Sequence, residues 1–465
     1  MNYQQFLESK IQVVERSGFE VSPDELHPST FPHQRDAIIW ALKLGRGLIA
    51  KRFGLGKTHD QCEIARIVHQ RTGGKFLILC PLGAKYMFEE EDGPRLGLRF
   101  QYVRTNADID PRRHNIAGVS LDEGDVLRNL GSKTFQIFED VFRDVRYKFI
   151  ATATPDPNSY KELIYFAHWL GIMDYGQALT RFFQRDSTKA GNLTLHPQHE
   201  DEFWHWVASW ALFLYAPADL GYPNDGYDLP EMKVHWHRIA VDHTRAWEQT
   251  DNRGQHRLFL DAAGGVSEAS TEKRATMQDR IEMAREIINT TGPDKHWILW
   301  HHLEDERRAI KAVLPEVMSV YGSQSLEERE SRIMGFARGQ FRFLSTKPEI
   351  AGSGPNFQRH CADAIFVGLN YKFRDIIQAI YRIYRYGQTK TVNIHFIYAE
   401  SEDPVVDAIK AKWQRYDRQT QKMRRMIKKY GLSHARMTQD LKRNIGVKRV
   451  EAHGQRFTAV NNDCV

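Results

Sequence analysis

One stretch constrains this chain more than any other. An apolar run from Gly47 to Ala50 has the character of a buried strand, and the residues from Cys62 to Val68 have the spacing of a helix. Between these two segments lie Gly54, Leu55, Gly56, Lys57 and Thr58. A strand, a glycine-containing turn and a helix N-terminus in this order are typical of a binding site for phosphate groups.

Each residue of this turn has its own expected task in binding a nucleotide. Gly54 and Gly56 let backbone N–H groups approach the β-phosphate, Lys57 brings a positive charge to the β- and γ-oxygens, and Thr58 ligates Mg²⁺. The pattern is a variant, because Lys51 stands where the first glycine of such a loop is usual. The alternative interpretation is a plain glycine turn between a strand and a helix.

A glutamine stands just upstream of this loop. The segment from Pro32 to Leu42 reads as a helix opened by proline, and its apolar face is formed by Ala37, Trp40, Ala41 and Leu44. Gln34 lies in this segment, where a side-chain amide can bind adenine. A solvated glutamine at a helix start explains the residue equally well.

Two adjacent acids follow another apolar strand. The strand runs from Ile116 to Leu121, and Asp122 and Glu123 come directly after it. Carboxylates at the tip of a buried strand are costly unless they have a partner. A magnesium ion bound with a nucleotide is such a partner, with Asp122 holding its water shell and Glu123 polarising the attacking water. The alternative is an acidic turn that opens the next helix.

Composition excludes several classes of protein. A chain of 465 residues with 41% hydrophobic residues suits two or three domains with real cores. The four cysteines lie far apart, which argues against a disulfide framework or a cysteine-rich zinc site. The N-terminus lacks a signal pattern, and no run of eighteen apolar residues occurs. We therefore expect a soluble cytoplasmic protein without membrane contacts.

Strands and helices alternate in two separate regions, which predicts an α/β fold with two parallel sheets. In the first region, further strands are expected at 75–81, 100–103 and 147–155, the last ending in a threonine-rich turn. A second α/β pattern starts near Ile281 and has no phosphate loop of its own, which suggests a nucleotide held in a cleft between two lobes. We expect a nucleotide-binding lobe over 1–159, an aromatic-rich helical insertion with a linker over 160–275, a second lobe over 276–403 and a basic tail over 404–465.

The insertion is crowded with aromatic residues. The spacing of Phe203, Trp206 and Trp210 favours a packed amphipathic helix over an open platform for stacking bases. His196, His199 and His205 raise the alternative of a metal site, but nothing else in the segment has ligand spacing.

The tail carries a strong excess of positive charge. The net charge of the chain is only +6, yet the helical pattern after Val406 contains nine basic residues against Asp407 and Asp417. The basic residues are Lys410, Lys412, Arg415, Arg418, Lys422, Arg424, Arg425, Lys428 and Lys429. Such a surface suits a nucleic-acid backbone, and its binding would be salt-dependent and indifferent to sequence. The alternative is a solvated basic helix, and residues 445–465 are expected to be disordered.

Two stretches of the second region resemble a known family. The segment from Gln378 to Lys390 resembles motif VI of superfamily 2 helicases, in the Q-A-x-x-R-x-x-R-x-G-Q-T-K form of SWI/SNF-like DNA translocases. The glycines and asparagine at Gly352, Gly354 and Asn356 are similar to the G-x-G-x-N of motif V. Arg382 and Arg385 are three residues apart and share a face if they lie on one helix.

The first region carries the same resemblance. Residues 48–58 are similar to the family's I-L-A-D-E-M-G-L-G-K-T, with Lys51 and Arg52 where two acids are usual. Gln34 matches its upstream glutamine, and the segment 153–155 matches its G-T-P. The resemblance covers about 31–155 and 296–402, and it looks closest to compact helicase-like proteins of phages and prophages.

The resemblance implies two RecA-like lobes that hydrolyse ATP with Mg²⁺ and move on double-stranded DNA without sequence specificity. It implies that Arg382 and Arg385 stabilise the transferring phosphoryl group when the lobes close. We expect Gly354 and Gln378 to contribute to ATP binding, and we expect a monomer. The residues expected to contact DNA or to couple hydrolysis to it are Pro81, Thr152, Thr154, Thr346, Asn356, Lys410 and Lys412.

Two departures from the family pattern leave other functions open. Asp125 stands where a histidine couples hydrolysis to DNA, and residues 105–110 run straight toward the Asp122 strand, where the family has a further strand with a threonine-tyrosine-glutamate stretch. One alternative is therefore a degenerate ATP- and DNA-binding protein without motor activity. Another is a small-molecule kinase that uses the same loop. A measurement of phosphate release with and without DNA distinguishes the motor, the degenerate binding protein and the kinase.

Overall fold

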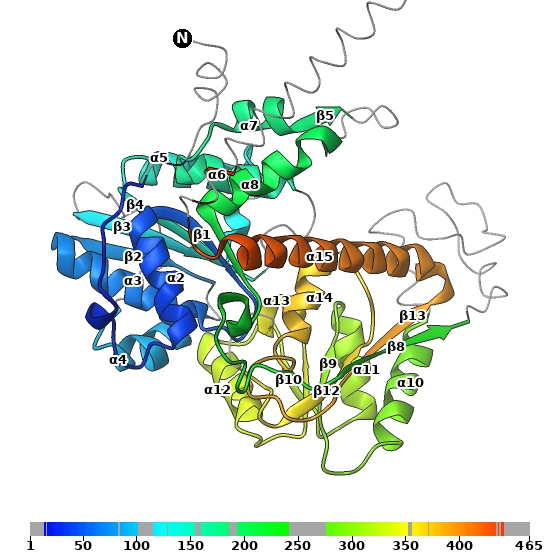
Figure 1. Cartoon of the computed structure of the whole chain (residues 1–465). Helices are drawn as coiled ribbons and strands as arrows, with labels where there is room; N and C mark the ends of the chain where they lie inside the picture. The colour runs from blue at the N-terminus through cyan, green and yellow to red at the C-terminus, as the bar shows by residue number, and fades with distance from the viewer. Residues whose placement is uncertain are drawn as a thin grey trace, which may run out of the picture. The chain divides into compact units, whose positions relative to one another are not determined.

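The chain forms two compact units, each built around a parallel β-sheet (Figure 1). The computed structural model describes residues 14, 16–81, 84–100, 115–127, 129–153, 160–185, 193–240, 276–351, 356–370, 372–433, 436 and 439–440. The first unit comprises Met1–Cys80, Phe88–Asn224 and Arg418–Val465, and the second comprises Pro81–Met87 and Asp225–Asp417. The predicted fold class, α/β with two RecA-like parallel-sheet lobes, is confirmed.

The sheet of the first unit has five strands in the order β2-β3-β4-β1-β7. They are β1 (Arg46–Lys51), β2 (Lys75–Leu79), β3 (Ile116–Asp122), β4 (Tyr147–Thr152) and β7 (Ala211–Leu214). All four pairings are parallel. The carboxyl ends of β1 and β3 therefore reach the same edge of the sheet, which is the edge that carries the phosphate loop and the two acids.

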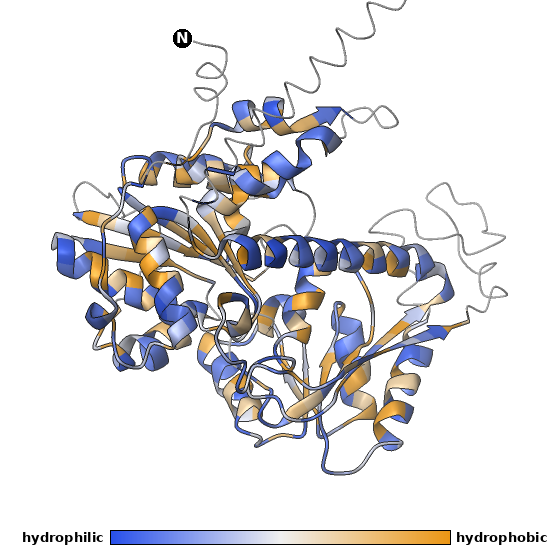
Figure 2. Ribbon diagram, in the orientation of Figure 1, coloured by the Kyte–Doolittle hydropathy of each residue, from blue (hydrophilic) through white to orange (hydrophobic). Residues whose placement is uncertain are grey.

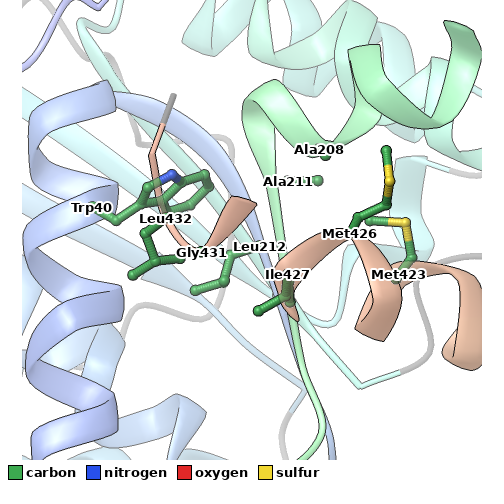
Figure 3. Close-up of a pocket in the computed structure, with 9 residues that line it drawn as sticks. All are labelled: Trp40, Ala208, Ala211, Leu212, Met423, Met426, Ile427, Gly431 and Leu432. Atoms are coloured by element: carbon green, nitrogen blue, oxygen red, sulfur yellow. The ribbon is translucent and has the colours of Figure 1, made fainter. Parts of the chain in front are cut away.

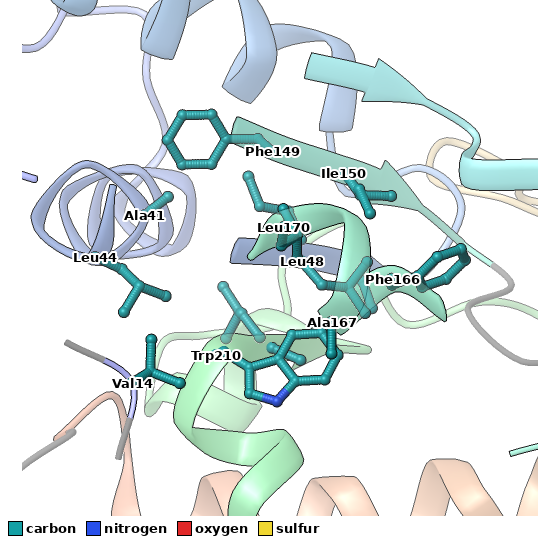
Figure 4. Packing of buried hydrophobic residues seen from close by; sticks show 14 of the residues in the cluster. Val14, Ala41, Leu44, Leu48, Phe149, Ile150, Phe166, Ala167, Leu170 and Trp210 are labelled. Carbon is teal, nitrogen blue, oxygen red and sulfur yellow. The ribbon is translucent and has the colours of Figure 1, made fainter. Parts of the chain in front are cut away.

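The helices of the first unit surround one apolar core. They include α2 (Pro32–Leu44), α3 (Lys57–Thr72), α5 (Lys133–Phe142), α6 (Lys161–Leu170), α7 (Tyr175–Phe182) and α8 (Glu200–Trp210). Figure 4 shows Leu48 of β1 and Phe149 of β4 close to side chains of α6 and α8. The predicted apolar face of α2, with Ala37, Trp40, Ala41 and Leu44, is buried in this core.

The aromatic insertion folds as a packed element rather than as an open platform. Phe203, Trp206 and Trp210 of α8 are buried, as their spacing predicted. A short antiparallel pair, β5 (Phe183–Arg185) and β6 (Leu193–Leu195), precedes α8. Strand β7 follows α8 at once and pairs with β1, so the insertion also supplies an edge strand of the first sheet. The sequence analysis did not predict this strand.

The sheet of the second unit has six strands in the order β10-β11-β9-β12-β13-β8. They are β8 (Met232–Ile239), β9 (His296–Trp300), β10 (Met318–Val320), β11 (Phe343–Thr346), β12 (Cys361–Phe366) and β13 (Val392–Ala399). Strand β8 lies in the segment that the sequence analysis treated as insertion. It pairs with β13 along its whole length, from Met232 opposite Val392 to Ile239 opposite Ala399.

Helices alternate with the strands of the second unit along the chain. They include α10 (Met277–Asn289), α11 (Glu304–Val313), α12 (Leu326–Ala337), α13 (Pro348–Ala351) and α14 (Phe373–Ile380). Trp297 and Leu299 of β9 and Ile310 of α11 share one apolar core with Ile281 of α10. The expected strand at 100–103 lies almost entirely outside the described residues, as does the expected disordered end.

The basic tail forms one long helix, α15 (Asp403–Tyr430), whose surface is mostly hydrophilic (Figure 2). Its apolar residues near the C-terminal end pack on the first unit, where Met423 and Ile427 join its core. Figure 3 shows these side chains beside Trp40 of α2 and Leu212 of β7. Within the described part of the chain, no helix has the length and apolar character needed to cross a membrane.

Candidate active site

The phosphate loop begins where β1 ends, at Lys51, and finishes at Gly56, directly before α3. Gly54 has a φ of 87° and Gly56 a φ of 73°, and both values lie in the left-handed region that side chains other than glycine rarely adopt. Leu55 between them is 1% exposed and anchors the loop in the core. The turn conformation therefore requires glycine at both positions.

Gln34 contacts this loop directly. Its amide nitrogen donates to the carbonyl oxygen of Gly56 at 3.3 Å, and its amide oxygen accepts from the backbone N–H of Phe31 at 3.1 Å. A Cβ atom at position 56 would collide with the Gln34 amide. Gln34 is thus a buried part of the loop structure, and the solvated-glutamine interpretation is wrong.

Lys57 and Thr58 begin α3, so the helix dipole and the Lys57 ammonium are placed at the same end of the helix. The Lys57 ammonium nitrogen lies 3.5 Å from the carbonyl oxygen of Lys51 and 5.0 Å from the ring centre of Phe53. Within the described residues, no side chain caps the first turn of α3. This helix start is suited to an anion.

The unusual Lys51 has a buried partner. Its side chain is fully buried and forms an ion pair with Asp60, in the first turn of α3. Burial lowers the pKa of Lys51 and raises the pKa of Asp60, and their mutual attraction opposes both shifts. The pair ties the end of β1 to the start of α3. The signal in the sequence was a lysine at the end of an apolar strand, which needs such a partner.

Glu123 is held by its backbone and by a threonine. Its φ of 62° is in the left-handed region, its N–H donates to Ala151 at 2.8 Å, and Thr152 Oγ1 donates to its carboxylate at 2.8 Å. A left-handed residue other than glycine stores strain and is often found at functional sites. Thr152, the last residue of β4, therefore positions the Glu123 carboxylate.

Asp122 is the last residue of β3 and is 9% exposed. The amide nitrogen of Gln61, on α3, donates to Asp122 Oδ1 at 2.9 Å. The hydroxyl of Ser120 donates to the amide oxygen of Gln61 at 2.7 Å. The sequence analysis missed Gln61 and Ser120, because nothing in their spacing shows that α3 packs on β3.

The N-terminus of α3 and the carboxylates of Asp122 and Glu123 lie at one edge of the first sheet. Thr58 and Asp122 carry the hard oxygen atoms that Mg²⁺ prefers, so these two residues suit a metal bound with a nucleotide. Glu123 lies next to Asp122, with its carboxylate oriented toward Thr152. This set of groups can bind a triphosphate and orient a water molecule for attack on it.

In the second unit, the arginines do not lie on a helix as the sequence predicted. Helix α14 ends at Ile380, and Arg382 and Arg385 lie in the turns that follow. The Gln388 side chain donates to the carbonyl oxygens of Cys361 and Ile383, at 3.1 and 2.9 Å, and so stabilises these turns. The shared-face argument for the two arginines is therefore wrong.

The other predicted residues of this unit are dispersed. Gln378 is buried on α14, and Thr346 is the fully buried last residue of β11. Asn356 and Lys412 are partly exposed, and Lys410 is exposed, with its ammonium 4.9 Å from the ring centre of Trp236. Pro81 belongs to the segment 81–87 that groups with this unit. Thr154 and Gly354 lie outside the described residues, as does the side chain of Asp125.

Comparison with known proteins adds distant relatives. No protein-family model matches the chain. The chain is 23% identical over 427 residues to the "DNA annealing helicase and endonuclease ZRANB3" of Mus musculus and 24% identical over 427 residues to that of Homo sapiens. Each match covers 81% of this chain and 39% of the relative, so the chain spans about two fifths of the relatives' length.

Two solved structures are also similar. One is the "Sulfolobus solfataricus SWI2/SNF2 ATPase core in complex with dsDNA", at 18% identity and a TM-score of 0.38, covering 82% of this chain and 90% of that one. The other is the core domain of the same ATPase, at 16% identity and a TM-score of 0.38, covering 84% and 90%.

Proposed function

We propose that this protein is an ATP-dependent DNA translocase or helicase of the SWI/SNF-like type. In this proposal it hydrolyses ATP with Mg²⁺ and couples hydrolysis to movement on double-stranded DNA. The observation that carries the proposal is the hydrogen bond between Gln61 and Asp122, because it joins the helix that starts with Lys57 to the acidic strand end. The phosphate loop and the acid pair thus form one site.

The residues of this site fit Mg²⁺ and a triphosphate. The loop N–H groups and Lys57 would bind the β- and γ-phosphates, and Gln34, which donates to the carbonyl oxygen of Gly56, would contact the base. Thr58 and Asp122 would hold Mg²⁺, which would neutralise charge on the phosphates when bound. The similarity to relatives that are named helicases supports the use of ATP at a coarser level.

Glu123 is the proposed base. Its carboxylate would accept a proton from the attacking water, and the hydrogen bond from Thr152 fixes its direction. We propose that Arg382 and Arg385 stabilise the charge that develops on the γ-phosphate, with the resemblance to motif VI as support. We further propose that Thr346 and Asn356 take part in coupling hydrolysis to DNA.

The rate of ATP hydrolysis with and without duplex DNA tests the proposal. A motor of this type requires stimulation by DNA, and Glu123→Gln should abolish turnover while leaving ATP binding intact. ATP binding without turnover in the unaltered protein would instead support a degenerate binding protein. Transfer of phosphate to a small acceptor, with no effect of DNA, would support a kinase.

The DNA-binding part of the proposal rests on α15. Its basic residues fall into two groups: Lys422 and Arg424 are paired with Glu200 and Asp219, whereas others lie on an exposed stripe. The basic residues of the stripe are Lys410, Arg418, Arg425 and Lys428. These cations face water along one side of the helix, which suits contact with a phosphate backbone of any sequence.

Two neighbouring arginines test this assignment. Arg425→Gln should weaken duplex DNA binding at low salt and lower the slope of log K against log salt by about 0.9, because one phosphate contact is lost. Arg424→Gln should leave the salt slope unchanged and lower thermal stability, because it leaves the fully buried Asp219 carboxylate without this partner. Equal salt slopes for both variants would contradict a role for the stripe. Fluorescence anisotropy with labelled duplex measures the salt slope of each variant, and thermal denaturation measures its stability.

A further inference from the structure

Gln61 is placed so that both ends of its amide are used. It is fully buried, and it lies between Ser120, which is also fully buried, and Asp122. The amide nitrogen donates to Asp122 at 2.9 Å, and the amide oxygen accepts from the Ser120 hydroxyl at 2.7 Å. The reverse orientation would set an amide oxygen against a carboxylate oxygen, and both are acceptors. The geometry therefore allows one orientation.

We propose that Gln61 is a positioning residue for the magnesium site, an inference that rests on the proposed function. A neutral amide fixes one oxygen of Asp122 without cancelling the charge that attracts the metal. A lysine or arginine at this place would fix the carboxylate too, but it would compete with Mg²⁺ for the negative charge. Groups that orient a metal ligand in this way have large effects on metal affinity.

The position of Gln61 on α3 gives it a second consequence. It lies four residues after Lys57, so the two side chains share one face of the helix. Asp60, the residue before it, is paired with Lys51 at the end of β1. The first turn of α3 is thus attached to β1 through Asp60 and to β3 through Gln61. This double attachment keeps the phosphate-binding lysine and the metal-binding carboxylate at a fixed separation.

The inference predicts a specific defect in metal use. Gln61→Met keeps the length of the side chain and removes its hydrogen bonds. We expect the Mg²⁺ concentration for half-maximal ATP binding to rise about 10–100-fold, the range found when partners of metal ligands are changed. ATP affinity in EDTA should stay within about twofold, because the Lys57 contacts remain. Equilibrium ATP binding, measured by calorimetry with and without Mg²⁺, gives both values.

Gln70→Met is the matched control. Gln70 is on the same helix but is exposed, and its amide oxygen accepts from Arg66 at 3.1 Å. This variant should need the same Mg²⁺ concentration as the unaltered protein. A common shift in both variants would mean that any loss of an amide from α3 has this effect, and it would overturn the inference.

A double-mutant cycle separates positioning from general destabilisation. In an Asp122→Asn background, Gln61→Met should cause no further shift in the Mg²⁺ requirement, because the carboxylate that it orients is gone. Should Gln61→Met fail to fold, Ser120→Ala removes the other end of the relay and should raise the Mg²⁺ requirement severalfold. A folded Gln61→Met or Ser120→Ala protein with an unchanged requirement would disprove the inference. Absence of Mg²⁺-dependent ATP binding in the unaltered protein would instead disprove the proposed function.

Discussion

The two lobes differ in the chain that leads from a sheet strand into a helix, as α3 and α11 show. In the first lobe, β1 leads through two left-handed glycines to α3, and no side chain among the described residues caps its first turn. In the second lobe, β9 leads directly to α11, and the carboxylate of Glu306 accepts from the backbone N–H groups of His302 and Leu303 at 2.8 and 2.9 Å. Both lobes are built on a parallel sheet, but the backbone N–H groups just ahead of α11 are bound by a side chain of that helix, whereas α3 follows a glycine loop.

Glu306 is a buried anion of the second lobe. It is fully buried and lies 3.1 Å from the Arg280 guanidinium, which also donates to the carbonyl oxygen of Val367 at 2.7 Å. Burial alone would raise the pKa of Glu306, but Arg280 and the two N–H groups hold that pKa below its usual value. The comparison shows that a buried carboxylate satisfies the N–H groups ahead of α11, at the place where the first lobe has its glycine loop.

The largest expected effect comes from removing the buried carboxylate of Glu306. Glu306→Ala leaves Arg280 buried without its charge partner, so it should lower the free energy of unfolding by about 3–5 kcal/mol. Urea denaturation measures this loss. Glu304→Ala, on the same helix but partly exposed and paired with Arg307 and Lys347, should cost no more than about 1 kcal/mol. Equal losses would show that Glu306 has no special role.

The next variant, Lys57→Ala, removes a charge from the proposed ligand site of the first lobe. Lys57→Ala should lower ATP hydrolysis by about 10²–10³-fold, the usual effect of removing one group that stabilises transition-state charge. Its free energy of unfolding should change little, because Lys57 serves the ligand rather than the fold. Steady-state phosphate release measures the loss of ATP hydrolysis, and urea denaturation of the same preparation measures the free energy of unfolding. A large loss of stability would make Lys57 a structural residue, comparable to Glu306.

Acid should weaken both lobes through buried histidines. Burial, with the Lys51 charge as a second cause, lowers the pKa of His33 to about 3, and burial lowers the pKa of His301 to about 4. Both values lie below the usual histidine pKa of 6.5. The neutral forms therefore stabilise the fold above pH 6.5, and this contribution is lost as the pH falls from 6.5 toward 4, since the unfolded chain binds protons that the folded chain does not.

Single variants assign the acid sensitivity to each lobe. His33→Asn and His301→Asn should each remove about 2 kcal/mol of the difference in unfolding free energy between pH 7 and pH 5. Urea denaturation at the two pH values measures it. A pH dependence that neither variant reduces would rule out both histidines as its source.

The smallest expected effect concerns Thr152, which binds the Glu123 carboxylate in the first lobe. Thr152→Val removes the hydroxyl that orients Glu123 and keeps the size of the side chain. Loss of one hydrogen bond to a carboxylate should lower the turnover rate about tenfold, with ATP affinity unchanged. Single-turnover kinetics separate these two quantities. A changed affinity with an unchanged rate would place Thr152 in nucleotide binding instead.

Local patterns gave much of this architecture. The phosphate loop, the helix over 32–42 and the acidic strand end were predicted from glycine placement and apolar periodicity. Strands β7 and β8 were missed, because each pairs with a strand far away in the sequence and their residues carry no signal of that partner. The helix assigned to Arg382 and Arg385 was wrong for the same reason, since Gln388 stabilises turns there through contacts with Cys361 and Ile383.

The sequence by itself determined which groups are available for chemistry: a glycine loop, Lys57, Thr58 and two adjacent acids. These features depend on a few neighbouring residues, so they can be recognised without the fold. Only the tertiary structure decided how the groups are oriented, through Gln61 and Thr152. It also decided that Asp60 pairs with Lys51 and that Glu306 pairs with Arg280. The physical reason is that a buried polar group must find its partner across the packed core, and the chain order does not record which helix meets which strand.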